Sequence, residues 1–368
     1  MLMTSPDLSF GSAAGRWARL GPYYAMFPID FVTETLRGYG TPGQAVIDPF
    51  CGRGTVPFVA MTLGLPAIAA DISPVAWIYA KTKTDPHPSL DAVKRRIAEV
   101  HDAGTNDDRQ PKHEFQEVAF CAKVLGFVNA ARRELDWRRS RLDRTVAALL
   151  IQHLHDKRGR GLSNQLRHSR AMAPDYCLRW WRSRGFERPP EVEPCAFLKD
   201  RAEWRYAKGV PKPTGEGRPR VALGDAARVL PASGRGATLV LTSPPYRGVT
   251  NYRADSWLRL WALGKGPSLP DWRTDQKYGN SGRYEKTLSA CFGATLKQTA
   301  PNAVWCVRSD ARRGTRQVIV DVLNKLLPNH RLDERPAPYK SATQTALYGD
   351  TGEKPGETDL FYMPPSKG

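Results

Sequence analysis

Glycine and aspartate residues at the ends of two short apolar runs could together hold a nucleoside. The first run, residues 45–47, leads into Asp48 and then into Gly52-x-Gly54, and the second run, residues 67–70, ends at Asp71. Glycines in a turn let the backbone approach a ligand closely, and an aspartate at a strand tip can accept hydrogen bonds from two adjacent ribose hydroxyls. The third glycine that would seat a pyrophosphate is missing, as is the Gly-Lys-Ser/Thr triplet of a phosphate loop. This segment therefore favours a nucleoside over a dinucleotide or a nucleoside triphosphate, and the alternative is an ordinary strand-turn-helix without a ligand.

A second candidate segment, Thr242-Ser243-Pro244-Pro245-Tyr246, could grip a flat ring. It directly follows residues 238–241, an apolar run that is typical of a buried strand. Because proline has a fixed φ angle and no N–H, the two prolines would hold their carbonyls and the following aromatic ring in a preset arrangement. The alternative is a simple turn that ends the strand.

Apolar periodicity predicts the elements that must position both segments. Between residues 45 and 70 the pattern is strand, glycine turn, helix (55–63) and strand, which predicts a parallel α/β unit with a ligand crevice at the carboxyl ends of its strands. The pattern resumes after residue 220, with strands predicted at 221–223, 238–241, 303–307 and 359–363 and a helix at 316–327. We therefore predict an α/β core formed by residues 1–85 and 218–368, and an insert formed by residues 86–217.

The chain is strongly basic. Its 368 residues include 55 Lys and Arg against 37 Asp and Glu, which gives a formal net charge of +18. Residues 112–220 contain 24 basic and 13 acidic residues, so 24 − 13 = +11 of that total lies there. Such a charge favours a polyanion, nucleic acid above all, as the partner. A hydrophobic content of 41% is enough for a packed core and excludes disorder of the whole chain.

The insert is predicted to be mainly helical and to contact nucleic acid. Apolar residues recur at helical spacing between residues 114 and 155, and a polar, basic loop follows at 158–170. The loop could contact phosphates or be a solvated surface, and Trp180 and Trp181 could be stacking surfaces or part of the core. The arginines of this loop are Arg158, Arg160, Arg167 and Arg170.

Several other classes of protein are disfavoured. The six cysteines include no Cys-x-x-Cys pair, so the sequence predicts no metal site and no disulfides and fits a reducing cytoplasm. Cys195 follows Pro194 in a Pro/Glu-rich connector rather than a strand tip, so we do not expect a thiolate nucleophile there. No apolar run reaches the roughly 18 residues of a membrane helix, so no membrane association is expected.

Three motifs together resemble the DNA methyltransferases that use S-adenosylmethionine to methylate amino groups. These motifs are Asp-Pro-Phe-Cys-Gly-Arg-Gly-Thr at 48–55, Asp71-Ile-Ser-Pro-Val-Ala and Thr-Ser-Pro-Pro-Tyr at 242–246, each at a predicted strand tip. The resemblance implies a doubly wound, mostly parallel sheet of seven strands. In that family the catalytic motif usually opens with Asp or Asn for adenine N6 and with Ser for cytosine N4, so Ser243 implies the cytosine N4 type.

The resemblance also implies roles for individual residues. Asp71 would hold the ribose, Asp225 would face the adenine amino group, and residues 16–31 would help to cover the methionine end. For Asp71 and Asp225 the alternative is an ordinary helix N-cap. The implied catalytic residues are Ser243, Pro244, Pro245 and Tyr246; the implied cofactor-binding residues are Tyr24, Pro28, Asp48, Phe50, Gly52, Gly54, Asp71, Ile72, Asp225 and Thr242; Tyr252 joins the four arginines as a nucleic-acid contact.

Together with the charge, the resemblance predicts a site-specific DNA methyltransferase of a restriction-modification system. The methyl group would pass from S-adenosylmethionine to cytosine N4, without a metal, leaving S-adenosylhomocysteine. The partners would be double-stranded DNA with its target base flipped out and a cognate restriction endonuclease, in the cytoplasm of a prokaryote or encoded by a phage, at the nucleoid. The alternatives are an adenine N6 DNA or RNA base methyltransferase and a non-catalytic nucleic-acid-binding protein on the same fold.

Overall fold

The computed structural model describes residues 7–22, 27–169, 171–215, 217–230, 236–247, 252–264, 280–311, 313–337 and 356–365. In chain order the helices and strands are α1 (Ala13–Ala18), α2 (Ile29–Tyr39), β1 (Val46–Asp48), α3 (Thr55–Thr62), β2 (Ala67–Asp71), α4 (Pro74–Thr84), α5 (Leu90–Asp102), η1 (Asp107–Arg109), α6 (Glu114–Ala119), α7 (Ala122–Glu134), α8 (Arg141–His153), α9 (Pro174–Arg182), α10 (Pro194–Tyr206), β3 (Arg220–Leu223), α11 (Ala226–Val229), β4 (Ala237–Thr242), α12 (Tyr252–Asp255), α13 (Trp257–Ala262), α14 (Ser281–Leu296), β5 (Thr299–Asp310), α15 (Arg313–Leu326), β6 (Arg331–Ala337) and β7 (Glu357–Met363).

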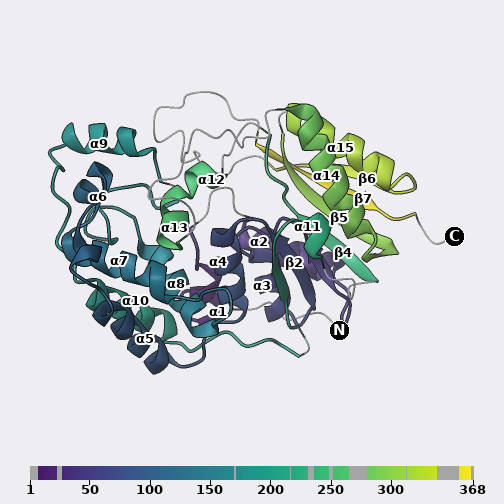
Figure 1. The fold of residues 1–368 in the computed structure, drawn as a ribbon. Coiled ribbons are helices and arrows are strands. Elements are labelled where there is room, and N and C mark those ends of the chain that lie inside the picture. Colours follow the sequence, from purple (N-terminus) through teal and green to yellow (C-terminus); the bar gives the residue numbers. More distant parts are fainter. Residues whose placement is uncertain are drawn as a thin grey trace.

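One sheet of seven strands runs through the molecule in the order β3-β2-β1-β4-β5-β7-β6 (Figure 1). The first five strands of this order pair in parallel, whereas β7 pairs antiparallel with both β5 and β6. The predicted α/β class, with a doubly wound and mostly parallel sheet, is therefore confirmed. The chain builds outward from β1 to β3 and then returns to the other side of β1 with β4, so the strand order reverses between β1 and β4. In such sheets ligands bind outside the carboxyl ends of the strands at this switch point.

Successive residues of each strand point to opposite faces of the sheet, and helices pack against both faces. Ile47, Val240 and Trp305 pack in one cluster with residues of α14 and α15. Val46 and Leu239 pack on the opposite face with α2 and α3. A strand that is buried on both faces is a nearly continuous apolar run rather than an alternating one. This is the pattern from which these strands are predicted.

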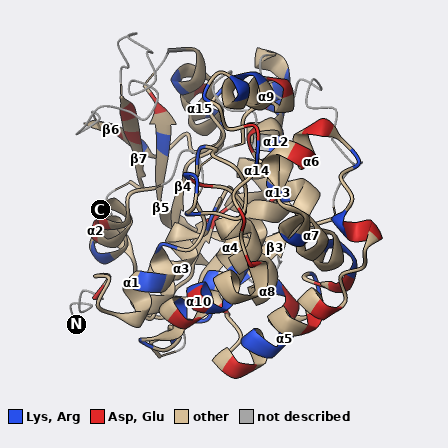
Figure 2. Ribbon diagram, turned by 90° about the vertical axis from the view of Figure 1, so that its left-hand side faces the viewer, with Lys and Arg blue, Asp and Glu red and all other residues tan. Residues whose placement is uncertain are grey.

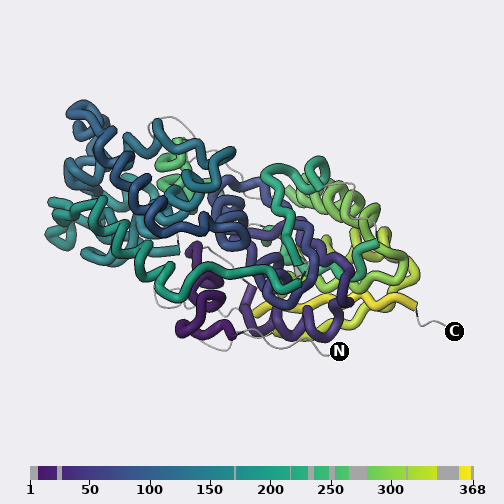
Figure 3. Tube along the Cα trace, turned by 90° about the horizontal axis from the view of Figure 1, so that it is seen from below, coloured from purple at the N-terminus to yellow at the C-terminus, as the bar shows by residue number. Residues whose placement is uncertain are grey.

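The insert forms a helical lobe beside the sheet (Figures 1 and 3). All the regular elements that the structure describes between residues 86 and 217 are helices, and the periodic stretch 114–155 corresponds to α6, α7 and α8. Helix α13 packs into the insert although it follows the Ser-Pro-Pro-Tyr motif in sequence. Trp257 lies against Phe115 and Trp261 against Phe120, with ring centroids 5.0 and 5.8 Å apart. The division of the chain at residues 85 and 217 stays a prediction.

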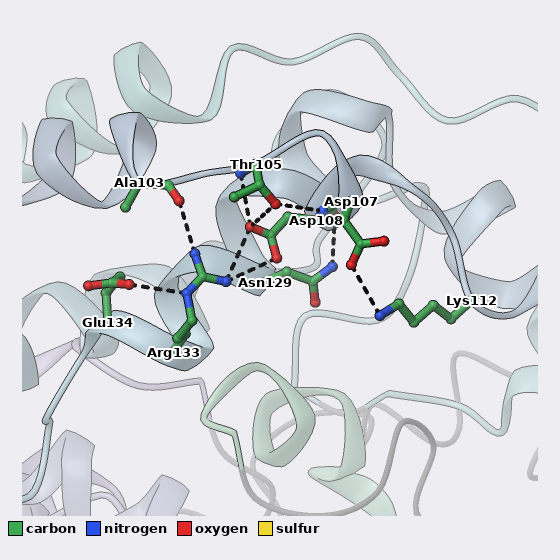
Figure 4. A network of polar contacts seen from close by, with 8 residues as sticks. All are labelled: Ala103, Thr105, Asp107, Asp108, Lys112, Asn129, Arg133 and Glu134. Carbon is green, nitrogen blue, oxygen red and sulfur yellow. Dashed lines mark hydrogen bonds and ion pairs between the residues drawn. The ribbon is translucent and has the colours of Figure 1, made fainter.

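Both signs of charge lie on the insert helices, as Figure 2 shows for α5 and α10. Part of this charge holds the lobe together. Arg133 of α7 donates to Asp108 at 3.1 Å and to the carbonyl of Ala103 at 2.9 Å, which ties α7 to η1 (Figure 4). A cavity of about 430 Å³ lies beside this network. Its lining residues are Asp108, Lys112, Gln116, Asn129, Arg132, Arg133, Trp261 and Gly264.

Candidate active site

The turn after β1 depends on glycines with left-handed backbone angles. Gly52 has φ +51° and Gly54 has φ +80°, a region that side chains with a Cβ rarely adopt. A Cβ on Gly54 would lie 2.5 Å from the Cβ of Ala80, so α4 packs directly against the turn. The N–H of Cys51 donates to the carbonyl of Ala70 at 3.0 Å and joins the turn to β2. Position 54 therefore requires glycine for both its conformation and its space.

A buried hydrogen bond joins the tips of β1 and β4. Thr242 Oγ1 donates to Asp48 Oδ1 at 2.7 Å, and the same oxygen accepts the N–H of Phe50 at 3.3 Å. Burial raises the pKa of Asp48 to about 7; the two hydrogen bonds lower the pKa, and the charge of Asp71 raises it. This contact brings the glycine turn and the Ser-Pro-Pro-Tyr motif together at the switch point of the sheet.

Asp71 at the tip of β2 holds the glycine turn in place. Its Oδ2 accepts the N–H of Gly52 at 2.8 Å, and its Oδ1 accepts the N–H of Ser73 at 2.8 Å. The N-cap of α4 is Ser73, so the N-cap alternative for Asp71 is wrong. Burial raises the pKa of Asp71 to about 6, while these two hydrogen bonds lower it. Each carboxylate oxygen keeps a further lone pair with which it could accept a ligand hydroxyl.

Asp225 lies at the same edge of the sheet but caps a helix. The N–H of Gly224 donates to the carbonyl of Asp71 at 2.9 Å, which places the start of α11 beside the tip of β2. Asp225 Oδ1 accepts the N–H of Ala227 at 3.0 Å, so Asp225 is the N-cap of α11, and this bond uses one of its two carboxylate oxygens. Phe50 is half-buried, and its ring packs edge-on against Phe292 at 6.0 Å.

The Ser-Pro-Pro-Tyr motif leaves β4 in the direction of β7. Ser243 Oγ donates to Tyr246 Oη at 3.2 Å, and Tyr246 Oη donates to Glu357 Oε1 at 2.7 Å. Ser243 and Pro245 are half-buried and Pro244 is buried. Tyr246 is only 6% exposed, so most of its ring lies within the protein.

Glu357 and Arg308 belong to this site although no motif identified them. Arg308 donates to both carboxylate oxygens of Asp359, at 2.6 and 2.8 Å, and its Nη1 lies 3.6 Å from Glu357 Oε2. Burial raises the pKa of Glu357, while the hydrogen bond from Tyr246 and the charge of Arg308 lower it. The sequence carries a signal for this pair. Arg308 follows the apolar run 303–307, and Glu357 and Asp359 stand at the start of the last strand, so opposite charges on the two strands predict a cross-strand pair.

The segment predicted to cover the methionine end lies partly against the glycine turn. Arg53 Nη1 donates to the carbonyl of Gly21 at 3.2 Å. Pro28 occupies the N-cap position of α2 and is exposed. The guanidinium of Arg308 lies 3.7 Å from the ring centroid of Phe31 in α2, which connects this segment to the ion pairs between β5 and β7. Tyr24 lies outside the described residues.

The structure describes the predicted nucleic-acid contacts only in part. Arg158 donates to Asn164 Oδ1 at 2.6 Å and to the carbonyl of Arg188 at 3.0 Å, so its guanidinium is engaged within the insert. Arg160 is exposed and Arg167 is half-buried. Arg170 lies outside the described residues, and so does the side chain of Tyr252, whose backbone begins α12.

Trp181 belongs to the core, which decides between its two predicted roles. It is fully buried, its Nε1 donates to the carbonyl of Gln165 at 2.7 Å, and its ring packs on Phe115. Trp180 is half-buried against Phe186.

Within the described ranges, no group of three or more His, Cys, Asp or Glu residues could hold a metal ion. In the same part of the chain, no helix has the length and apolar character needed to cross a membrane.

No protein-family model matches the chain, and no curated protein sequence does. Among solved structures, the rRNA methyltransferase AviRa from Streptomyces viridochromogenes is 15% identical, with 99% of this chain and 94% of that chain covered and a TM-score of 0.34. A provisionally named rRNA methylase from Clostridium thermocellum is 6% identical, with 92% of this chain and 99% of that chain covered and a TM-score of 0.35. Similarities this distant do not indicate what the chain does.

Proposed function

We propose that this protein is an S-adenosylmethionine-dependent methyltransferase that methylates cytosine N4 in DNA. The observation that carries the proposal is the hydrogen bond between Thr242 and Asp48, which brings a glycine turn suited to a nucleoside against a rigid motif suited to a flat base. Both segments lie at the switch point of a doubly wound sheet, where ligands of such folds bind. A nucleoside methyl donor and a nucleobase would therefore meet in one crevice.

The residues around the crevice fit S-adenosylmethionine. Asp71 keeps lone pairs for two ribose hydroxyls, and Asp225 would accept from the adenine amino group. Ile72 is 70% exposed beside Asp71, and a large apolar side chain held in water at a crevice is suited to cover an adenine ring. Phe50, Gly52 and Gly54 would line the same space. When bound, the cofactor supplies a methyl group on a sulfonium sulfur and leaves as neutral S-adenosylhomocysteine.

Ser243 and Pro244 would orient and activate the amino group of the base. An exocyclic amino nitrogen is a poor nucleophile, because its lone pair is delocalised into the ring, so it must be held in line with the methyl group. Ser243 gives its own hydrogen to Tyr246, which leaves the lone pairs of Oγ free to accept from the amino group. The Pro244 carbonyl would accept the second amino hydrogen, and Tyr246, whose ring is mostly buried, would hold Ser243 in place through its hydroxyl. Two acceptors draw electron density toward the nitrogen.

Double-stranded DNA is the proposed substrate, with the target base turned out of the helix at a cost of a few kcal/mol. The net charge of +18 supports a polyanionic substrate, and the exposed Arg160 would contact phosphates. A cognate restriction endonuclease and a nucleoid-associated place in a prokaryotic or phage-infected cytoplasm belong to the same proposal.

The first test is to incubate the purified protein with labelled S-adenosylmethionine and either unmethylated genomic DNA or total RNA. The products are then digested to nucleosides and weighed. N4-methylcytosine in DNA is the expected result. N6-methyladenine would retain the enzyme class and reject the assignment from Ser243, whereas label in RNA alone would reject DNA as substrate. No label in either, with no cofactor binding in a calorimeter, would favour the non-catalytic nucleic-acid-binding alternative.

Substitution of Ser243 tests the catalytic assignment. Ser243→Ala is expected to lower kcat by about 10²- to 10³-fold, the effect of losing one preorganised polar partner, while S-adenosylmethionine still binds. Ser183→Ala is the matched control, because Ser183 is an exposed serine after α9 whose hydroxyl donates to a local carbonyl. Normal turnover by Ser243→Ala would contradict the assignment.

A further inference from the structure

A series of hydrogen bonds begins at Ser243 and runs in one direction, from the end of β4 toward β7. Ser243 Oγ donates to Tyr246 Oη at 3.2 Å, and Tyr246 Oη donates to Glu357 Oε1 at 2.7 Å. Each hydroxyl passes its hydrogen toward the carboxylate and keeps its lone pairs on the side from which a proton would arrive. The chain connects the end of β4 with the first residue of β7. Such an uninterrupted chain can move a proton by a short shift at each oxygen.

The end of the chain is held in a fixed geometry. Arg308 donates to both oxygens of Asp359, and its Nη1 lies 3.6 Å from Glu357 Oε2. In the sheet, Arg308 stands opposite Asp359 and Asp310 stands opposite Glu357. Because Arg308 lies beside Oε2, Oε1 is left facing Tyr246.

We propose that Glu357 receives, through Tyr246 and Ser243, the proton that the amino group loses on methylation; this inference rests on the proposed function. The nitrogen lone pair forms the new N–C bond, and the electron pair of the broken C–S bond stays on the departing thioether. The amino proton passes to Ser243 Oγ, the serine hydrogen passes to Tyr246 Oη, and the tyrosine hydrogen passes to Glu357 Oε1. Both hydroxyls end neutral, and the carboxylate ends as a carboxylic acid. Glu357 reaches the substrate only through the two hydroxyls and is therefore a positioning residue.

The surroundings of Glu357 suit a proton acceptor. Burial raises its pKa; the hydrogen bond from Tyr246 and the charge of Arg308 lower it, and the charges of Asp359 and Asp310 raise it. A carboxylate that binds a proton more readily than an ordinary glutamate is better matched to this task near neutral pH. The side chain is still 19% exposed, so the proton can leave to water before the next turnover.

The test compares Glu357→Gln with Tyr246→Phe, the first removing the final acceptor and the second interrupting the chain while keeping the ring. Each is expected to lower kcat by about 10²-fold, the usual contribution of a positioned acid or base, with the dissociation constant of S-adenosylmethionine within twofold of the wild type. The double variant should be no slower than the slower single variant, because the residues act as one unit. In the wild type, kcat should fall on the acid side as Glu357 becomes protonated, and this fall should be absent from Glu357→Gln.

Infrared titration gives a measurement that does not depend on turnover. The band of a protonated carboxylic acid that disappears in Glu357→Gln should titrate, in the wild type, with the same pKa as the acid side of kcat. Glu334→Gln is the matched control, because Glu334 pairs with Arg316 and takes no part in the hydrogen bonds from Ser243 to Glu357. Loss of the Glu334 carboxylate should leave kcat and the pH profile of kcat unchanged. If the wild type is active and Glu357→Gln keeps the wild-type kcat and profile, the relay is refuted and the methyltransferase proposal stands. A wild type that methylates neither DNA nor RNA overturns both.

Discussion

Asp48 should make the protein less stable as the pH rises from acidic values to neutrality. Burial of Asp48 raises its pKa from 3.8 to about 7, so the folded protein holds a proton on this carboxyl that the unfolded chain releases. At about 1.4 kcal/mol per tenfold change in proton affinity, this rise corresponds to about 4 kcal/mol of unfolding free energy. By the sign of the shift, that stability is fully present below pH 3.8 and is lost as the pH rises to about 7. Between pH 5 and 8 the loss from this one group is about 3 kcal/mol.

Asp48→Asn isolates this contribution, because the amide oxygen still accepts from Thr242 but carries no titrating proton. We expect the unfolding free energy of the wild type, minus that of Asp48→Asn, to fall by about 3 kcal/mol between pH 5 and 8. Urea unfolding of both proteins at several pH values, followed by tryptophan fluorescence and circular dichroism, measures this difference. Thr242→Val, which removes a hydrogen bond that lowers the pKa of Asp48, should move the pH window upward. A difference that stays constant with pH would refute the reasoning.

Three further substitutions test how the site is held. Arg308→Met leaves Asp359 buried without its partner and should cost about 3–5 kcal/mol of unfolding free energy in urea; a loss below about 1 kcal/mol would contradict this account. Gly54→Ala places a methyl group against Ala80 at a left-handed position and should weaken S-adenosylmethionine binding in a calorimeter, whereas Gly43→Ala, with φ +77° and no atom within 4 Å, should not. Lys83 is fully buried and its Nζ has no hydrogen-bond partner among the described residues; burial, with the charges of Arg53 and Arg205, holds its pKa well below 10.5. Lys83→Met should therefore be more stable than the wild type in urea, by a margin that grows as the pH falls from 10 to 7, and an equal margin at both values would disprove it.

The parts of the fold that sequence could predict are those buried on both sides. Residues 238–241 and 303–307 are continuous apolar runs, and they form the middle of β4 and the middle of β5, which extends from Thr299 to Asp310. Strand β6 was missed. Its residues Arg331–Ala337 include two arginines, an aspartate, a glutamate and a proline, and none of its residues is buried, so no apolar pattern marks it. It is a strand because β7 supplies a ladder for it, which is a tertiary contact that local periodicity does not contain.

The candidate site also contains residues that the sequence predicts and contacts that only the tertiary fold creates. The tips of β1, β2 and β4 carry short motifs whose residue types are unusual at a strand end, and these were visible in the sequence. The contact between Glu357 and Tyr246 was not, because the two residues are 111 positions apart and meet only after β7 has folded back beside β5. The packing of α13 into the insert was invisible for the same reason. Its apolar residues predict a helix with a buried face but not the partner that covers the face.

Some of the basic residues are buried and form hydrogen bonds inside the protein rather than on its surface. Arg259 of α13 is buried and donates to three insert carbonyls, those of Ile151, His168 and Ser169. The basic loop after α8 is therefore fixed by hydrogen bonds from the helix that follows the Ser-Pro-Pro-Tyr motif. Buried arginines of this kind contribute to the net charge of +18 without being available to a polyanion, so the charge alone overstates the surface that nucleic acid could use.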